Sequence, residues 1–335
     1  MILMAIEGIM ASSPLLLVEN LQTRFKIKSG YIHAVNSIWY QIDEHETVAL
    51  VGESGCGKTA SQLSVMRLIS YPGEILSGKV LFEGQDLLGF KAKSRELSAI
   101  RGRKISMIFQ EPHSAFNPVL TIGCQIAEML KKHLGMSSGQ AKKRSIELLA
   151  MVKIPHAEHN LENYPHQFSG GMLQRVMIAM ALSCSPKLLI ADEPTSALDV
   201  TTQYLVLDLL SQLVLNHGAS MVLVTHNLGI AAKYASRIII MYAGQIVETG
   251  ACKDVFRHPR HPYTIGLMRC IPQINIDKKS RMKPIRGAPP SLSAVPTTCS
   301  FLPRCESKFS DCHNKPVPSL IEAADRHYVR CHGLL

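Results

Sequence analysis

One short stretch constrains the fold of this chain more than any other. Residues 52–59 read GESGCGKT and match the pattern G-x-x-x-x-G-K-[ST] in full, between an apolar run at 47–51 and a helical segment at 61–70. Glycines allow consecutive backbone N–H groups to turn inward around phosphate oxygens, and the positive end of the helix dipole adds to the attraction. The stretch therefore predicts a strand–loop–helix unit that binds the phosphates of a nucleoside triphosphate.

The residues of this loop are expected to have distinct roles. Lys58 can neutralise the β- and γ-phosphates, and the Thr59 hydroxyl can ligate Mg²⁺. The residues expected to bind the nucleotide are Gly52, Glu53, Ser54, Gly55, Cys56, Gly57, Lys58 and Thr59. A glycine-rich turn that binds nothing is the alternative, and the strand before the loop and the helix after it argue against that interpretation.

Further apolar runs rich in β-branched residues alternate with helical stretches. We expect strands at 105–109, 188–191 and 221–224, helices at 61–70 and 170–184, and a hairpin from 237–242 and 245–249. Short strands that are apolar throughout suit a parallel sheet covered on both faces, which predicts an α/β fold. Residues 116–165 carry more helix formers and fewer β-branched runs, so they are expected to form a helical insertion.

Two adjacent carboxylates follow the apolar run at 188–191. Because side chains alternate along a strand, Asp192 and Glu193 are expected to point to opposite sides. Asp192 can hold the hydration shell of Mg²⁺, and Glu193 can polarise an attacking water as a general base. Two acids after an apolar run also often begin a surface loop, so this interpretation depends on the phosphate loop upstream.

A pentapeptide shortly before these acids points to a family. Phe168, Ser169, Gly170, Gly171 and Met172 open a predicted helix and resemble the signature motif of ABC-type ATPases, usually L-S-G-G-Q. Phe168 stands in place of the leucine and Met172 in place of the glutamine. The serine and both glycines, which can bind phosphate at a helix N-terminus, are present.

Three more residues occur in the order of this family. Gln110 is placed as the Q-loop glutamine, Asp199 ends the D-loop sequence SALD, and His226 is placed as the switch histidine. The resemblance covers residues about 14–250 and implies that the nucleotide is ATP. It implies that the catalytic residues are Glu193, His226 and Gln110, and that the residues around Mg²⁺ are Thr59, Gln110 and Asp192.

The resemblance to ABC-type ATPases also implies a fold and an assembly. The fold is a RecA-like parallel sheet with an antiparallel β subdomain and a helical subdomain. Two ATPases face each other head to tail, and each completes the other's ATP site in trans with Ser169, Gly170, Gly171 and Asp199. An aromatic residue upstream of the phosphate loop stacks on adenine, and Tyr31 is the candidate here.

Two further stretches narrow the resemblance. Residues 110–118 (QEPHSAFNP) resemble the segment after the Q-loop in peptide-importer ATPases, and 261–264 (HPYT) with 285–292 (IRGAPPSL) resemble their C-terminal extension. The chain thus resembles the DppD/OppD type of dipeptide/oligopeptide importer ATPase. We expect an N-terminal tail at 1–13, an ABC ATPase domain at 14–255 with a helical subdomain at about 116–165, and a small irregular C-terminal extension at 256–335.

The C-terminal extension concentrates positive charge and cysteine. Residues 251–335 hold 14 Lys and Arg against 6 Asp and Glu, in a chain of formal net charge +10. The four cysteines of its last forty residues can complete a tetrahedral zinc site or an iron–sulfur cluster, and reduced thiols packed in a small core are the alternative. The resemblance favours a [4Fe-4S] cluster on Cys299, Cys305, Cys312 and Cys331. Its negative charge is expected to be offset by Arg304, Lys308, Arg326 and Arg330.

The resemblance implies an ATP-hydrolysing subunit on the cytoplasmic face of the cell membrane, which drives uptake of dipeptides or oligopeptides. No apolar run reaches roughly 18 residues, so the membrane span is expected in partner subunits. The expected partners are a second, paralogous ATPase, two permease subunits and an extracytoplasmic binding protein. The alternatives are import of nickel or another small solute, and a soluble ABC ATPase that acts on nucleic acid; a nucleic-acid partner is not expected, because the chain has one motif set and no long coiled coil.

Overall fold

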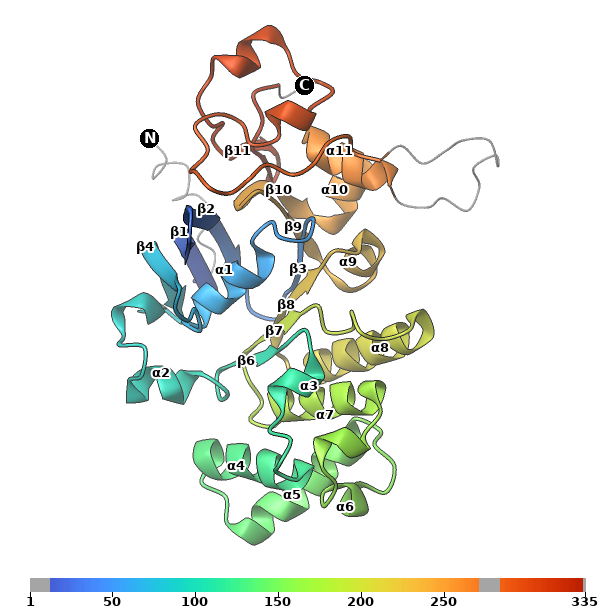
Figure 1. Ribbon diagram of the computed structural model, residues 1–335. Helices are drawn as coiled ribbons and strands as arrows, with labels where there is room; N and C mark the ends of the chain where they lie inside the picture. The colour runs from blue at the N-terminus through green and yellow to red at the C-terminus, as the bar shows by residue number, and fades with distance from the viewer. Residues whose placement is uncertain (1–12, 271–283, 334–335) are drawn as a thin grey trace.

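A computed structural model describes residues 13–270 and 284–333 of the chain. The predicted N-terminal tail therefore lies, except for residue 13, outside the described residues. The larger sheet occupies the middle of the molecule, with a helical lobe at one end and the C-terminal segment at the other (Figure 1). None of the helices in the described ranges has the length and apolar character needed to cross a membrane.

Five parallel strands make up one side of the larger sheet, whose order in the described residues is β11-β12-β10-β9-β3-β8-β7-β6. The parallel strands are β3 (Thr47–Val51), β6 (Ile105–Ile108), β7 (Leu188–Asp192), β8 (Ser220–Thr225) and β9 (Arg237–Tyr242). Nearly all their residues are buried, because helices cover one face and the antiparallel sheet described below, with one helix, covers the other. The predicted α/β fold is confirmed.

Three antiparallel strands extend this sheet beyond β9. Strand β10 (Gln245–Ala251) forms the predicted hairpin with β9, β12 (His327–Val329) pairs with β10, and β11 (Ile321–Ala324) pairs with β12. The prediction that the C-terminal extension is irregular was therefore wrong for these two last strands. They are short and half polar, so their pairing depends on the edge that β10 offers and not on a local pattern.

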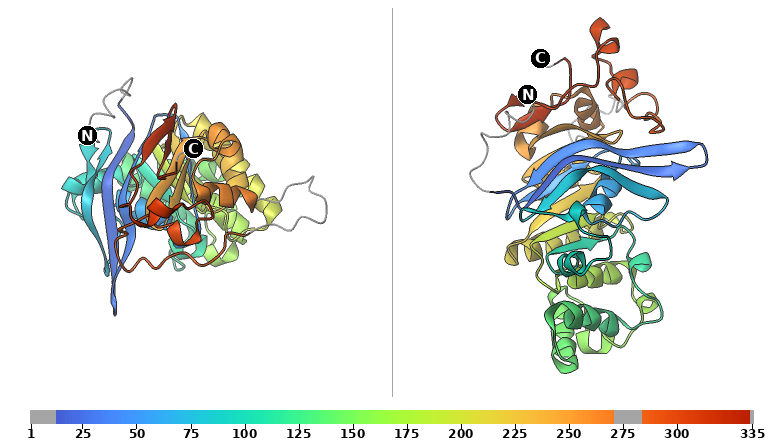
Figure 2. Two further views of the ribbon diagram at one scale, coloured as in Figure 1. Left: turned by 90° about the horizontal axis from the view of Figure 1, so that it is seen from above. Right: turned by 90° about the vertical axis from the view of Figure 1, so that its left-hand side faces the viewer.

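A second, antiparallel sheet has the order β2-β1-β4-β5. Its strands are β1 (Leu16–Ile27), β2 (Gly30–Ile42), β4 (Gly73–Phe82) and β5 (Gln85–Asp86). The two views of Figure 2 show this sheet standing beside the larger one. It forms the antiparallel β subdomain that the family resemblance implied. Helix α1 (Lys58–Val65) contacts strands of both sheets.

Helix α1 differs in its bounds from the predicted helix at 61–70. It begins at Lys58, directly after the left-handed Gly57, and it ends at Val65. Arg67 has a φ of 52°, in the left-handed region, which is incompatible with a continuing α-helix. The helix therefore starts at the last residues of the phosphate loop itself.

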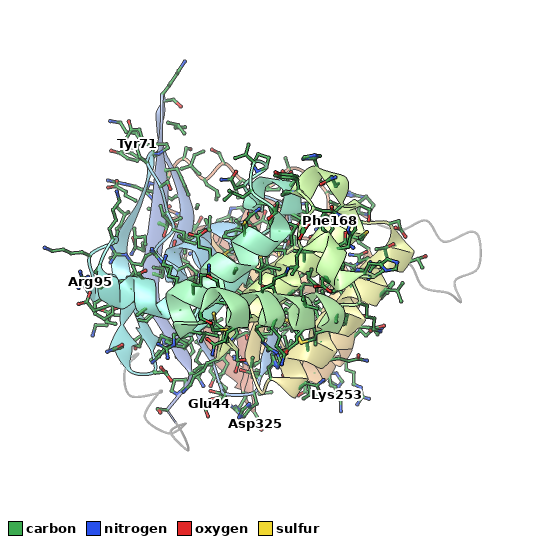
Figure 3. All side chains as sticks on the ribbon, turned by 90° about the horizontal axis from the view of Figure 1, so that it is seen from below. Glu44, Tyr71, Arg95, Phe168, Lys253 and Asp325 are labelled. Atoms are coloured by element: carbon green, nitrogen blue, oxygen red, sulfur yellow. The ribbon has the colours of Figure 1, made fainter. Side chains whose placement is uncertain are left out.

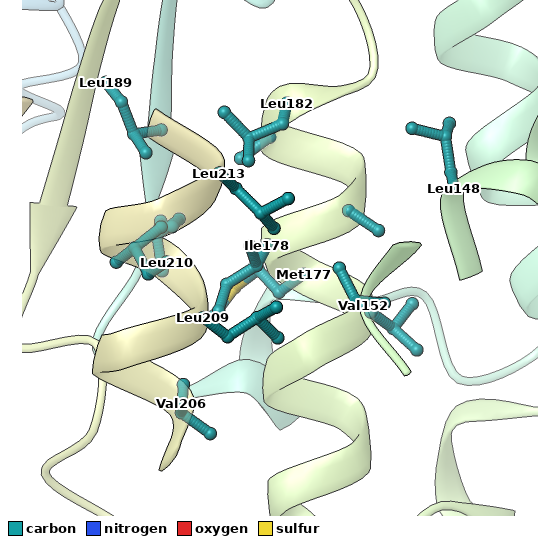
Figure 4. Packing of buried hydrophobic residues seen from close by; sticks show 14 of the residues in the cluster. Leu148, Val152, Met177, Ile178, Leu182, Leu189, Val206, Leu209, Leu210 and Leu213 are labelled. Atoms are coloured by element: carbon teal, nitrogen blue, oxygen red, sulfur yellow. The ribbon is translucent and has the colours of Figure 1, made fainter. Parts of the chain in front are cut away.

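The helical insertion forms a lobe joined to the sheet by α7 (Gly170–Leu182). Figure 4 shows how α7 packs on α8 (Val200–Asn216), with Leu209 and Leu213 of α8 facing Met177 and Ile178 of α7. The lobe itself contains α3 (Pro112–Ala115), α4 (Ile122–Leu134), α5 (Ser138–Met151), α6 (Ala157–Asn160) and the 3₁₀ turn η3 (Pro165–Gln167). A side-chain oxygen caps α4, α5, α7 and α8 at Thr121, Ser137, Ser169 and Asp199.

The remaining helices are short, and one of them, α9, packs on β3 and β8. They are α2 (Arg95–Ile100), α9 (Leu228–Tyr234), α10 (Cys252–Arg257) and α11 (Pro262–Arg269), with 3₁₀ turns η2 (Leu87–Gly89), η4 (Leu302–Arg304) and η5 (Ser310–His313). Helix α10 spans the predicted boundary at residue 255, so the chain passes from the sheet into the C-terminal segment without a linker at that point.

Candidate ATP site

The phosphate loop lies against strands β2 and β9 and leaves no room for a side chain at two of its glycines. A Cβ on Gly57, whose φ is 103°, would lie 2.1 Å from the Ala34 carbonyl oxygen, and one on Gly52 would lie 2.3 Å from that of Met241. Both distances are far below van der Waals contact. The neighbouring backbone therefore requires glycine at both positions, and the left-handed conformation of the loop is a second reason at Gly57.

Lys58 is placed at the centre of the loop. Its side chain is buried, and its Nζ donates hydrogen bonds to the carbonyl oxygens of Gly52 at 2.9 Å and Glu53 at 3.1 Å. Charged phosphate oxygens are stronger partners for an ammonium group than neutral carbonyls. The geometry thus holds the ammonium where it can transfer its hydrogen bonds to a bound triphosphate.

Thr59 and Asp192 meet although they are far apart in the sequence. The Thr59 hydroxyl donates a hydrogen bond of 3.1 Å to Asp192 Oδ1, and the Asp192 side chain is almost fully buried. Burial raises the pKa of Asp192, and the neighbouring charge of Glu193 adds to the shift. Hydroxyl and carboxylate oxygens are the ligands that Mg²⁺ prefers, so this pair fits the predicted magnesium site.

Glu193 is held between the other two predicted catalytic residues. Gln110 Nε2 donates to Glu193 Oε2 at 3.3 Å, and His226 Nδ1 lies 3.3 Å from Glu193 Oε1. Glu193 has a φ of 44°, and its N–H donates to the Val224 carbonyl. A non-glycine residue in the left-handed region costs free energy, and such strain gathers at functional sites. The two adjacent carboxylates thus have different partners, Thr59 for Asp192 and Gln110 with His226 for Glu193.

The signature segment lies beside the D-loop. Ser169 caps α7, and the closest neighbours of Gly170 and Gly171 are Leu198 and Thr202. Phe168, where the family pattern has leucine, is buried in the core of the helical lobe. Within this chain the segment therefore presents its helix N-terminus next to Asp199, which caps α8.

Comparisons with known proteins identify the family of this chain. The family described as ABC transporter matches residues 35–196, and the oligopeptide/dipeptide transporter C-terminal region matches residues 247–312. The oligopeptide transport ATP-binding protein AppD of Bacillus subtilis is 47% identical over 322 residues, covering 95% of this chain and 96% of AppD. The dipeptide transport ATP-binding protein DppD of Haemophilus influenzae is 45% identical and covers 95% of both chains.

This chain belongs to the peptide-transport ATP-binding proteins of the ABC family. A solved structure with a similar fold is the dimeric post-hydrolysis state of the ATP-binding cassette MJ0796, bound to ADP and phosphate. It aligns with a TM-score of 0.63 and 30% identity over 71% of this chain and 98% of that one.

The candidate adenine-stacking residue lies outside these contacts. Tyr31 is near the start of β2, and the guanidinium carbon of Arg24 lies 3.9 Å from the centre of its ring. This cation–π contact occupies one face of the ring. The assignment of Tyr31 to adenine in this ABC protein stays a prediction.

The four C-terminal cysteines share one neighbourhood. Burial raises the pKa values of Cys299, Cys305 and Cys331, and the charge of the other thiols in the set, including Cys312, adds to each shift. No group of three or more His, Cys, Asp or Glu residues in the described part of the chain is arranged to hold a metal ion. The predicted [4Fe-4S] cluster is therefore not shown.

Two of the arginines expected to offset a cluster have other partners. Arg304 pairs with Glu53 of the phosphate loop, and Arg326 lies 3.5 Å from Asp43. That part of the prediction was wrong, because these charges are used to attach the C-terminal segment to the ATPase body. Arg330 is close enough to Cys299 for the thiolate to influence its pKa, although burial has the larger effect and lowers it.

From the sequence alone, Arg304 was not expected at the ATP site, and Tyr263 was not singled out within its segment. Both contact Glu53 of the phosphate loop, over 251 and 210 residues of sequence. Tyr263 lies in the HPYT stretch that resembled the family extension, so that stretch was the available signal. Nothing in the local sequence indicated its partner.

Proposed function

We propose that this chain binds and hydrolyses ATP as the ATP-binding subunit of an ABC importer for dipeptides or oligopeptides. The arrangement of Glu193 between Gln110 and His226, close to the Thr59–Asp192 pair, carries the proposal. It combines a proton acceptor, two polar residues that orient it, and oxygen ligands for Mg²⁺ at the end of one sheet. The peptide cargo is proposed from the AppD and DppD relatives.

In this proposal each group has one task. The phosphate loop and Lys58 bind the triphosphate, Thr59, Gln110 and Asp192 surround Mg²⁺, and Glu193 accepts the proton of the attacking water. His226 orients Glu193 through the contact at 3.3 Å. Bound Mg²⁺ neutralises charge that develops on the phosphate oxygens.

The second half of the site comes from another subunit in this proposal. Ser169, Gly170 and Asp199 are exposed in the structure, and Gly171 is partly exposed. They are therefore free to close on ATP held by a second ATPase, which we propose to be a paralogue. Closure of the pair is transmitted to two permease subunits at the cytoplasmic face of the membrane, with an extracytoplasmic binding protein supplying the peptide.

The domain division follows from the same proposal. Residues 14–255 form the ABC ATPase domain, with the helical subdomain at about 116–165, and residues 256–335 form the C-terminal extension. The family matches at 35–196 and 247–312 support this division.

Transport and hydrolysis can be tested together. The chain, its partner ATPase and the permeases are reconstituted in vesicles with binding protein, and uptake of labelled dipeptide, a longer peptide and Ni²⁺ is measured with phosphate release. Peptide uptake that requires ATP supports the proposal. Uptake of Ni²⁺ alone identifies the small-solute alternative, and absence of both, with intact assembly, refutes an importer role.

For the C-terminal extension we propose that Cys299, Cys305, Cys312 and Cys331 hold a [4Fe-4S] cluster, with zinc as the alternative. Burial raises the pKa values of Cys299, Cys305 and Cys331, and the charge of Cys312 raises each of them further, so the four thiols lie close enough to supply a donor set. An anaerobic preparation is assayed for iron, sulfide and zinc. About four irons and four sulfides per chain support the cluster, one zinc supports the alternative, and the absence of all three refutes a metal site.

A further inference from the structure

The phosphate loop is held on its outer side by the C-terminal segment. Arg304, in the 3₁₀ turn η4, makes a two-pronged contact with the Glu53 carboxylate. Its Nη1 lies 2.9 Å from Oε2 and its Nη2 lies 3.1 Å from Oε1. The Tyr263 hydroxyl accepts a hydrogen bond of 3.0 Å from the backbone N–H of the same glutamate. One loop residue is thus bound through both its side chain and its backbone.

The guanidinium group of Arg304 is held by several further hydrogen bonds. Besides Glu53, its nitrogens donate to the carbonyl oxygens of Arg286 at 3.0 Å and Ile285 at 3.4 Å, and to the Tyr242 hydroxyl at 3.4 Å. Its side chain is 6% exposed, against 26% for Glu53. A planar guanidinium that is hydrogen-bonded in this way loses little further freedom when it binds a carboxylate, so the contact is rigid.

A cluster of aromatic side chains supports the second contact, between the Tyr263 hydroxyl and the Glu53 N–H. The Tyr263 ring centre lies 4.6 Å from that of Tyr242 and 5.5 Å from that of Phe301, and all three side chains are buried. Tyr242 ends β9, Tyr263 belongs to α11, and Phe301 directly precedes η4. The hydroxyl that meets Glu53 is therefore supported by the sheet and by the C-terminal segment together.

We propose that Arg304 and Tyr263 are positioning residues that preorganise the phosphate loop for ATP. A phosphate loop binds with backbone N–H groups that turn inward, and a flexible loop must lose conformational freedom to do so. The hydrogen bond to the Tyr263 hydroxyl fixes the orientation of the Glu53 N–H, and the Arg304–Glu53 ion pair holds the start of the loop. The C-terminal extension in this way raises the affinity of the ATP site without touching the nucleotide. The inference rests on the proposed function, since it takes the loop to bind ATP.

The test measures binding and loop mobility in the full chain. Affinity for the non-hydrolysable analogue AMP-PNP with Mg²⁺ is measured by calorimetry for wild type, Arg304→Ala, Arg304→Lys and Tyr263→Phe. Hydrogen exchange of the peptide containing residues 52–57 is measured without nucleotide. We expect Arg304→Ala to weaken binding about tenfold and Tyr263→Phe about threefold, with faster hydrogen exchange in the loop of both variants. In these variants the loop must be ordered when the nucleotide binds, and the free energy of that ordering reduces the affinity.

Arg304→Lys keeps the charge and the aliphatic stem but lacks the two-pronged fork, so we expect an intermediate affinity. Arg326→Ala is the matched control. Arg326 also lies in the C-terminal segment and contacts a carboxylate of the body, but its partner is Asp43 and its side chain is 63% exposed. We expect this variant to bind AMP-PNP with the affinity of wild type.

A thermodynamic cycle separates positioning from a general loss of stability. If Arg304 acts through Glu53, then Arg304→Ala in a Glu53→Ala background weakens binding no further. Equal affinities and equal loop exchange in wild type, Tyr263→Phe and Arg304→Lys would overturn the inference, even if Arg304→Ala failed to fold. Failure of the wild type to bind AMP-PNP would instead overturn the proposed function.

Discussion

Replacing Glu193 by glutamine removes the proposed proton acceptor and keeps the size of the side chain. Gln110 and His226 each lie 3.3 Å from a different oxygen of this carboxylate. A carboxamide retains one carbonyl oxygen that Gln110 can still reach. Because the change also removes a charge that raises the pKa of Asp192 (burial being the larger cause), it does not weaken the magnesium site. We therefore expect folding and MgATP binding to survive.

The loss in turnover can be estimated from the missing chemistry. General-base catalysis contributes about 10²- to 10⁴-fold to a rate. Glu193→Gln should therefore raise the activation free energy by about 3–5 kcal/mol. The same variant should bind ATP within about threefold of wild type, since the hydrogen bonds of Lys58 and the contact between Thr59 and Asp192 are unchanged.

Phosphate release and nucleotide binding, measured on the same preparation of the assembled transporter, decide this prediction. Glu44→Gln is the matched control, since Glu44 is an exposed carboxylate at the surface (Figure 3). It should hydrolyse ATP at the wild-type rate. Phosphate release by Glu193→Gln within threefold of wild type would refute the assignment of the base, and loss of ATP binding would show that Glu193 belongs to the binding site instead.

Three further predictions follow from other contacts. Thr59→Ala removes the hydroxyl that meets Asp192, so ATP binding should become about tenfold less sensitive to added Mg²⁺; unchanged Mg²⁺ dependence in titrations would contradict this. Burial lowers the pKa of His261 from 6.5 to about 4. Between these pH values the unfolded chain binds a proton that the folded chain does not, so the free energy of unfolding should fall by about 2 kcal/mol from pH 7 to 5. In urea unfolding, the free energy of unfolding of His261→Asn should depend less on pH than that of wild type. Leu210→Ala, at a fully buried position of α8 in the hydrophobic core, should cost about 3 kcal/mol in urea unfolding, whereas Leu215→Ala, at a position 79% exposed on the same helix, should cost little.

The amino-acid sequence determined the chemistry of the ATP site to a large extent. The spacing of the phosphate loop, the acids at the end of an apolar run and the residues Gln110 and His226 are local patterns. Each follows a buried parallel strand, and the carboxyl ends of such strands meet at one edge of the sheet. The pairing of Thr59 with Asp192 follows from that geometry, which is why it could be predicted before the structure was known.

The attachment of the C-terminal segment was decided by tertiary structure alone. Residues 251–335 are basic and rich in cysteine. This composition favoured a separate, irregular extension whose basic residues offset the negative charge of a [4Fe-4S] cluster. In the fold, β12 instead adds to the edge of β10, and Arg304 reaches Glu53 across 251 residues. Strand pairing at a sheet edge and ion pairs between distant segments produce no periodic pattern in a sequence. Each partner of such an ion pair, taken alone, resembles an ordinary polar surface residue. Local patterns therefore determined which residues surround ATP, and long-range packing determined what holds the loop in place.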